Sequence, residues 1–414
     1  MGAVWVDHPS WEIVQVASDL SGRDVAHLLL EADKDELRQT RNAQLVTFVS
    51  SLIALDALER VGLEPGGVAG HSLGEYTALV ASGALALEDG INLVVERGEA
   101  MQAAAEESSG TMAAILGLGD DDAMAACMRA EADVWVANFN APGQIVVAGT
   151  PQGIECVTRV AKEMGAKKVL SIPVGGAFHS PLMSSAKDRL RKALGTVQFE
   201  DPEIPVVANV DAKVHPLGGE WSSLLSAQLC SPVRWHQTLE TFEALGARAY
   251  IEVGTGGVLV GLARRIVGDS KALVVAKPDD IEFLLGVLSD GKPLQAYVAS
   301  HGGEHTHIAE RVIVSPIAGI FDPSPSLGAN SPSARHLPNQ GAGKSIGDAK
   351  VREATVQSAP GVGFFPVHIG DSIGEVSEVP VLSQFQGNLM GFLVMPGERV
   401  AVGQPLAWLT VDED

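Results

Sequence analysis

The residue types best suited to chemistry surround Ser72, in the stretch Gly70-His71-Ser72-Leu73-Gly74-Glu75-Tyr76. An apolar run, 67–69, precedes this stretch, and a helix-forming run, 77–81, comes after it. Strand, sharp turn and helix is the order that a G-x-S-x-G nucleophile elbow requires. We expect the glycines at 70 and 74 to let strand and helix approach closely while the serine hydroxyl stays exposed. The alternative is a tight turn with a structural serine, because so short a pattern also recurs by chance.

A serine hydroxyl becomes a good nucleophile only when a base takes its proton. His179 is the strongest candidate base, although a structural histidine is the alternative for any single histidine. His71 is a rival, but adjacent residues in an elbow point apart, so we expect His71 to be structural. An α/β-hydrolase would place an acid between the serine and the histidine. None presents itself, so we expect a carbonyl or amide group to orient the imidazole.

Arg97 lies on a largely apolar predicted helix that comes after the elbow. An arginine beside a nucleophile can bind a substrate carboxylate with two parallel hydrogen bonds. The alternative is a surface ion pair with Glu96 or Glu99, which contributes little to stability.

The pattern along the chain predicts the elements that position these residues. Residues 1–60 read as helices, and no strand-like run precedes the first of them, which is unusual for an open α/β sheet. Residues 108–174 predict strand, helix, two strands, helix and strand, the split βαβ order of a ferredoxin-like unit, with Asn140–Gly143 joining the two middle strands. The alternation of strand and helix resumes with strands predicted at 206–209, 249–253 and 273–275. The expected fold is therefore an α/β domain over residues 1–288 that carries an inserted ferredoxin-like subdomain.

Composition narrows the class of protein. The chain has 414 residues, which suits two or three domains, and 46% of them are hydrophobic. A net charge of −22 argues against nucleic acid as a partner. No apolar run has the length of a spanning helix, and no signal peptide is expected, so we predict no membrane association. The three cysteines, Cys127, Cys156 and Cys230, are not clustered and fit a reducing cytoplasm.

The last third of the chain differs in kind. Residues 289–307 read as a linker, and His301, His305 and His307 within it match no spacing typical of a metal site, so no metal is expected. Residues 308–414 are rich in β-branched residues, glycine and proline, and 313–320 and 365–373 are repeated by 382–389 and 393–400. Between the halves, 323–359 is rich in serine and proline and predicts a loop.

Six ordered motifs together resemble a known family. They are Gly70–Tyr76, Arg97-Gly98-x-x-Met101-Gln102, Asn138-x-Asn140-x-Pro142-x-Gln144, Gly176–Ser180, Gln228-x-x-Ser231-Pro232-Val233-x-Trp235 and Glu252-Val253-Gly254. Residues 1–285 resemble the malonyl-CoA:acyl carrier protein transacylases of fatty acid and polyketide synthesis. The resemblance implies an α/β-hydrolase-like core with a ferredoxin-like subdomain, malonyl-CoA as substrate and acyl carrier protein as partner.

The resemblance also implies roles for single residues. Ser72 would carry the malonyl group, His179 would be the general base and acid, and the main-chain carbonyl of Gln228 would orient His179. The amide of Leu73 would contribute to the oxyanion hole. The substrate-binding positions would be Arg97, Asn140, Phe178, Met101 and His71, with Arg97 on the malonyl carboxylate. Phe178 is similar to the residue that malonyl-selective members carry before the histidine. Members that take methylmalonyl usually carry a smaller residue there.

The chain departs from the family pattern at its start. Family members open with a buried strand that ends in Gly-Gln-Gly, and the amide of that glutamine completes the oxyanion hole. Residues 1–5 resemble the stretch directly C-terminal to that segment. We therefore expect roughly fifteen further residues upstream, by analogy to a strand and a turn. A single lost oxyanion donor would cost about 10²–10³ in rate.

Residues 308–414 resemble a biotinyl/lipoyl domain, a flattened barrel of two similar halves. Such domains carry the cofactor on a lysine in a hairpin, here about Glu375–Val381, but the sequence has no lysine after Lys350. We expect neither covalent biotin nor lipoate, and we interpret the domain as a docking module. Two other functions stay open at this point. A serine esterase or thioesterase would need a triad acid and no Arg97, and a non-catalytic assembly subunit would fit the missing first strand.

Overall fold

The computed structural model describes residues 2–268 and 270–288, and the segments 309–315, 319–323, 365–377, 379–383, 386–392, 398–400 and 405–411. The chain divides into two compact units, Met1–Leu294 and Gln295–Asp414. The predicted linker 289–307 and most of the predicted loop 323–359 lie outside the described residues; Pro323 itself ends strand β8 (Gly319–Pro323). None of the helices in the described part of the chain is long and apolar enough to cross a membrane.

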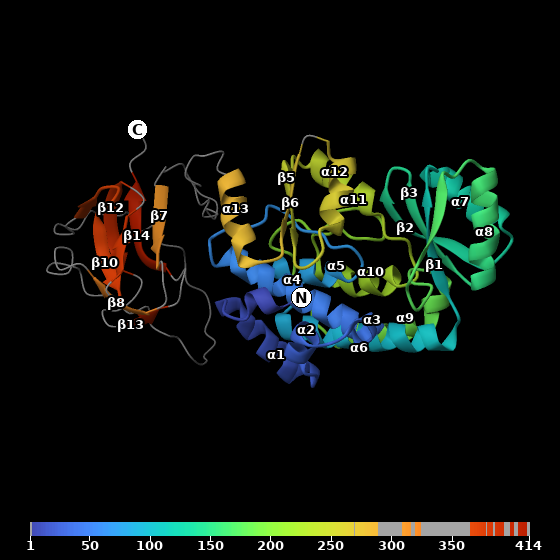
Figure 1. Ribbon diagram of the computed structural model, residues 1–414, viewed down its shortest axis with the longest axis horizontal. Coiled ribbons are helices and arrows are strands. Elements are labelled where there is room, and N and C mark those ends of the chain that lie inside the picture. Colours follow the sequence, from blue (N-terminus) through green and yellow to red (C-terminus); the bar gives the residue numbers. More distant parts are fainter. Residues whose placement is uncertain are drawn as a thin grey trace, which may run out of the picture. The chain divides into compact units, whose positions relative to one another are not determined.

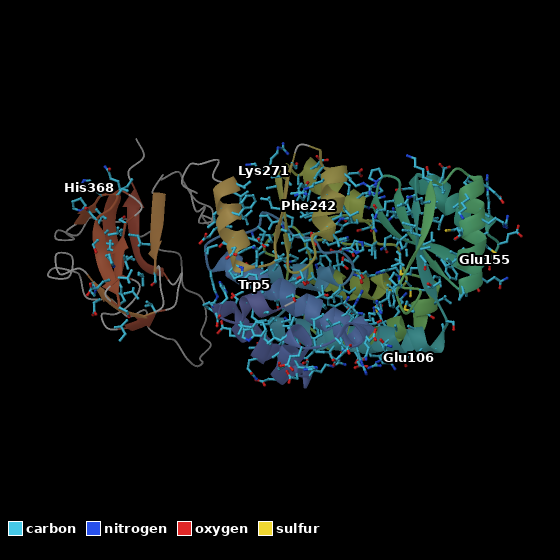
Figure 2. All side chains as sticks on the ribbon, in the orientation of Figure 1. Trp5, Glu106, Glu155, Phe242, Lys271 and His368 are labelled. Atoms are coloured by element: carbon cyan, nitrogen blue, oxygen red, sulfur yellow. The ribbon has the colours of Figure 1, made fainter. Side chains whose placement is uncertain are left out.

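Helix α4 (Thr40–Glu59) is the centre of the first unit, as the apolar run after Thr40 predicts. It is apolar on nearly all sides, which is typical of a buried helix. It packs against helix α6 (Leu87–Glu107) and against smaller helices that precede it. Those are η2 (Pro9–Trp11), α1 (Glu12–Ser21), α2 (Val25–Leu30) and α3 (Lys34–Arg38). Trp5 is buried, and its indole N–H donates to the carbonyl of Ala276 (Figure 2).

The expected strands at 67–69 and 206–209 are shorter than predicted. They form a single parallel bridge, between Val68 and Val206. Each segment turns away at once, the first into the elbow at Gly70 and the second into an antiparallel bridge from Val207 to Val214. Strands β5 (Ala249–Val253) and β6 (Lys271–Val275) do form, and they pair in parallel. The described residues therefore contain parallel strand pairs with helices around them, a mixed α/β arrangement.

The elbow leads into helix α5 (Gly74–Ala81). A Cβ built on Gly70 would lie 1.8 Å from the carbonyl carbon of Gly74, whereas one built on Gly74 would meet nothing within 4 Å. The expectation that both glycines are needed for close approach is therefore wrong for Gly74. The backbone of Gly74 occupies the space where a side chain on Gly70 would lie.

Gly70→Ala is expected to lower the free energy of unfolding by more than about 4 kcal/mol, because two backbone segments would have to separate under the nucleophile. Urea unfolding followed by circular dichroism measures the effect. Gly74→Ala, in the same turn but facing open space, is the matched control and should unfold near the wild-type midpoint. Equal midpoints for the two variants would contradict the close approach at Gly70.

The inserted unit has the predicted order of elements. These are β1 (Thr111–Leu116), α7 (Asp120–Arg129), β2 (Val134–Ala141), β3 (Gln144–Gly149), α8 (Pro151–Glu163) and β4 (Lys168–Ile172). The strands form one antiparallel sheet in the order β2-β3-β1-β4, with α7 and α8 packed together beside it (Figure 1). Glu155 lies on the exposed face of α8 (Figure 2). Asn140 was expected in the connecting loop, but β2 continues to Ala141 and only Pro142 and Gly143 turn the chain.

The described part of the first unit closes with five further α-helices. They are α9 (Ser184–Leu194), α10 (Trp221–Gln228), α11 (Trp235–Ala244), α12 (Val258–Ile266) and α13 (Pro278–Leu288). Main-chain hydrogen bonds join the inserted unit to this part of the chain, because Phe139 N–H donates to Val233 O and Val233 N–H donates to Ala137 O. The sheet of the inserted unit is thus fixed to the segment that enters α11.

The second unit consists of strands among its described residues. They are β7 (Ala309–Val314), β8, β9 (Phe365–Val367), β10 (Ser372–Val376), β11 (Val379–Leu382), β12 (Gly387–Phe392), β13 (Glu398–Val400) and β14 (Pro405–Val411). They form two four-stranded sheets, β11-β10-β8-β13 and β7-β14-β12-β9. Strands β10 and β11 form a hairpin at the predicted position, and the two sheets share a buried apolar core that includes Phe321, Ile373 and Leu389.

Candidate active site

Ser72 and His179 are 107 residues apart in the sequence and meet directly. The Ser72 Oγ lies 2.7 Å from His179 Nε2. Both residues have positive φ angles, 54° and 60°, which non-glycine residues seldom adopt. Such backbone strain is concentrated at functional sites, where the surrounding structure holds it in place. The elbow and the segment after β4 are therefore both shaped to bring these two side chains together.

The other ring nitrogen of His179 faces a main-chain carbonyl. Its Nδ1 lies 2.9 Å from the carbonyl oxygen of Gln228, at the end of α10. An N–H at Nδ1 leaves Nε2 as the acceptor that faces the serine hydroxyl. The geometry agrees with the expected pair of serine and histidine without a triad acid: no carboxylate of the described residues contacts His179.

Burial keeps His179 neutral. Burial, together with the nearby charge of Arg97, lowers the pKa of the imidazole to about 3. Near neutral pH the imidazole is therefore uncharged, which is the form that can accept the Ser72 proton.

Arg97 lies inside the site and not on the surface. It is 1% exposed, and its Nη2 donates to Ser72 Oγ at 3.0 Å and to Gln228 Oε1 at 2.9 Å. Its Nη1 donates to Gln44 Oε1 at 2.6 Å. The surface alternative is wrong, because Glu96 pairs with Arg189 and Glu99 pairs with Arg23 and Arg41.

The Arg97 guanidinium contacts no carboxylate in the described part of the chain. Its Nε has no acceptor, and burial lowers the pKa of the side chain. The guanidinium also lies over the ring of Tyr76, 5.6 Å from its centroid. A buried cation beside a nucleophile, with no carboxylate in direct contact, is suited to binding a negatively charged group.

The remaining predicted residues lie around this centre. His71 Nε2 is 2.9 Å from Asn140 Oδ1, and its ring lies beside Trp235. Met101 is buried behind Gln44, whose Nε2 is 3.3 Å from the Met101 sulfur. Phe178 is partly buried at the edge of the main core.

One backbone donor points to a free position. The N–H of Leu73, at the start of α5, has no acceptor among the described residues. The N–H of Ser72 is already used, since it donates to Asn209 Oδ1 at 2.7 Å. Leu73 is therefore the donor in this turn that can stabilise an oxyanion.

Comparison with known proteins agrees with this geometry. Residues 13–281 match the sequence profile described as the acyl transferase domain. The malonyl CoA-acyl carrier protein transacylase of Bacillus subtilis is 38% identical over 269 residues, which are 64% of this chain and 85% of that protein. The chain belongs to the acyl transferase family. This finding confirms the resemblance to malonyl-CoA:acyl carrier protein transacylases predicted for the first two thirds of the chain.

Solved structures of similar acyl transferases cover the same part. The acyl-carrier-protein S-malonyltransferase of Burkholderia pseudomallei is 40% identical with a TM-score of 0.65, over 68% of this chain and 93% of that one. A malonyl-transacylase in complex with the holo acyl carrier protein of a type II polyketide synthase is 35% identical, also with a TM-score of 0.65, over 67% of this chain and 91% of that one.

Sequence reasoning missed three polar residues of this acyl transferase site. Gln44 holds Arg97, and Glu75 and Asn209 lie beneath the elbow. A signal was present for each: Gln44 interrupts an apolar helix, Glu75 is a carboxylate within the elbow motif, and Asn209 ends the apolar run 206–208. Their partners lie 53 to 153 residues away, so only the fold reveals what they bind.

Proposed function

We propose that the protein transfers a malonyl group from malonyl-CoA, through an ester on Ser72, to the phosphopantetheine thiol of an acyl carrier protein in fatty acid or polyketide synthesis. The observation that carries this proposal is Arg97. Its buried guanidinium lies 3.0 Å from the Ser72 hydroxyl and contacts no carboxylate within the described chain. A cation there selects an acyl group that ends in a carboxylate, whereas a neutral acyl group offers it no counter-charge.

The first half-reaction forms the acyl-enzyme. Ser72 Oγ attacks the thioester carbonyl while its proton passes to His179 Nε2, and the Leu73 N–H stabilises the oxyanion. As the tetrahedral intermediate collapses, the carbon–sulfur bond breaks and His179 gives its proton to the thiolate of coenzyme A. The carbonyl of Gln228 holds the imidazole in the required tautomer and stabilises its transient charge.

The second half-reaction reverses the first with another thiol. His179 removes the proton of the carrier's phosphopantetheine thiol, and the sulfur attacks the Ser72 ester. The carbon–oxygen bond then breaks, and His179 returns the proton to Ser72 Oγ. This sequence is a ping-pong transfer through a covalent intermediate. Asn140 and Phe178 are proposed to line the acyl position, with Phe178 excluding a branched malonyl group.

The alternative of a serine esterase or thioesterase is less well supported, since the described residues offer no triad acid and Arg97 would lack a role. A non-catalytic assembly subunit is also disfavoured, because the hydrogen bonds from Ser72 to His179 and from His179 to Gln228 are formed. Labelling with two thioesters separates these three functions.

Malonyl-CoA is expected to add one malonyl group to the protein, and acetyl-CoA is expected to add far less, because Arg97 pairs only with the carboxylate. Intact-mass analysis after brief mixing measures the adduct, and a holo acyl carrier protein added next should remove it. Ser72→Ala is the control and should gain no mass. No adduct on the wild type would favour the assembly subunit, and equal labelling by both thioesters followed by hydrolysis would favour the esterase.

We propose that the second unit is a biotinyl/lipoyl-like domain that carries no covalent cofactor and serves in docking. The support is the hairpin of β10 and β11 at the expected attachment site and the absence of lysine after Lys350. No metal or other cofactor is needed for the proposed reaction. The free cysteines Cys127, Cys156 and Cys230 support a reducing, cytoplasmic location.

A further inference from the structure

A buried carboxylate lies directly beneath the nucleophile. Glu75, in the first turn of α5, is fully buried. Its Oε1 accepts from the main-chain N–H of Asn209 at 2.7 Å, and its Oε2 accepts from the side-chain amide of Gln228 at 2.6 Å. The proposed acyl transfer does not use this group.

The first partner of Glu75 holds the elbow. Asn209 Oδ1 accepts from the Ser72 N–H, and Asn209 Nδ2 donates to the Gly70 carbonyl, each at 2.7 Å. The asparagine side chain thus fixes a peptide group on each side of His71. These bonds oppose relaxation of the positive φ angle at Ser72.

The second partner of Glu75 joins the other groups of the site. The Gln228 side-chain amide also donates to the Ser72 carbonyl at 2.8 Å, and its Oε1 accepts from Arg97. The main-chain carbonyl of the same residue accepts from His179. A rotation of the Gln228 side chain would therefore disturb Ser72 and the Arg97 guanidinium together, and a shift of its backbone would disturb His179.

We propose that ionised Glu75 is a positioning residue, which holds Asn209 and Gln228 so that Ser72, His179 and Arg97 keep their relative places. This inference rests on the proposed acyl transfer. The ionised form is required because both carboxylate oxygens face N–H donors. A protonated carboxyl would carry its proton on one of these two oxygens, which would then be the weaker acceptor, and one of the two bonds would be weakened.

The groups around Glu75 bring its pKa into the pH range in which the enzyme can be assayed. Burial raises its pKa to about 7, against the opposing effects of the two N–H donors and of Arg97 on α6, while Asp211 raises it slightly. Activity should therefore fall as pH falls below about 7. His179 adds no limb in this range, because burial lowers its pKa to about 3.

Stability should change with pH in the opposite direction. The pKa of Glu75 is raised above its unfolded value, so its contribution to stability is fully present at low pH and is lost as pH rises through about 7. If Glu75 acted only through stability, the protein would be least stable at high pH, which is where we expect acylation to be fastest. The pH profile of the reaction separates positioning from structure.

The test compares the wild type with Glu75→Gln at several pH values from about 5.5 to about 8.5. Two rates are measured: labelling of Ser72 by a fluorophosphonate probe, which needs no malonyl group, and acylation by malonyl-CoA. We expect both wild-type rates to fall about tenfold per pH unit below the pKa of Glu75. Glu75→Gln should be about 100-fold slower and independent of pH. The amide offers one acceptor where the site needs two.

Glu252→Gln is the matched control, because each oxygen of Glu252 also accepts from one N–H group, here the main-chain N–H groups of Gly257 and Val260, outside the site. It should keep the wild-type rates and profile. The inference would be overturned if the rates of Glu75→Gln fell at low pH as those of the wild type do. It would also be overturned if the wild-type rates did not change with pH. The second result does not depend on whether the variant folds. Labelling that depends on pH in a wild type that gains no malonyl group would support the positioning role and remove the proposed function.

Discussion

His179→Ala is expected to slow the acylation of Ser72 by malonyl-CoA about 10⁴-fold, the upper range for loss of a positioned general base. Without the imidazole at 2.7 Å, the serine proton has no acceptor and the leaving thiolate has no donor. Arg97 cannot substitute, because a guanidinium only donates. The remaining rate should come from the Leu73 N–H and from binding of the carboxylate.

Rapid-quench measurement of the acyl-enzyme, followed by mass spectrometry, determines this rate constant. The wild-type rate should show no limb from His179 near neutral pH, because a base with a pKa of about 3 stays neutral there. His27→Ala, at a partly exposed helix position outside the site, is the control. Acylation of His179→Ala within tenfold of the wild type would show that another base acts on Ser72.

Arg97→Ala is expected to reduce kcat/KM for malonyl-CoA about 10²–10³-fold and to change that for acetyl-CoA much less. The substrate carboxylate would then be buried without its cation. The expected 10²–10³-fold loss corresponds to about 3–4 kcal/mol of binding free energy, within the range found for removal of one partner of a buried charge pair. The ratio of the two kcat/KM values is the informative quantity. Any general disturbance from unpaired Gln44 and Gln228 slows both substrates and cancels in the ratio.

Arg189→Ala serves as the control for charge, since Arg189 is an exposed arginine that pairs with Glu96, next to Arg97 in sequence. It should leave the preference for malonyl-CoA unchanged. A preference retained by Arg97→Ala would mean that a different group recognises the carboxylate, and the proposed function would lose its main support.

Local spacing was sufficient to predict the elbow, the inserted unit and the candidate base. The elbow depends on a glycine and a strand-to-helix turn within seven residues, and the inserted unit alternates strands and helices at ordinary lengths. The position of Arg97 inside or outside the site could not be decided in this way. Its helix carries Glu96 and Glu99 as local partners, and only packing against α4 turns the guanidinium inward toward Gln44.

The network beneath the elbow depended on long-range contacts. Glu75 bonds to Asn209 and Gln228, 134 and 153 residues away, and no periodicity in the sequence signals such pairs. The strands at 67–69 and 206–209 were overpredicted for a related reason. Apolar three- and four-residue runs indicate burial, but hydrogen-bonded length depends on where the neighbouring backbone turns away.

The two partners in proton transfer come from different parts of the chain and meet at Gln228, which contacts both. Ser72 is held by the core through Asn209 and Gln228, whereas His179 comes after the last strand of the inserted unit, which has a separate apolar cluster of its own. Two main-chain hydrogen bonds, between β2 and the segment before α11, join the inserted unit to the core. The Ser72–His179 distance of 2.7 Å therefore depends on Gln228, which contacts both residues, as well as on the position of the inserted unit. A ligand that moves the segment of His179 away from the Gln228 carbonyl would uncouple proton transfer without occupying the acyl site, and it would inhibit without competing with either thiol.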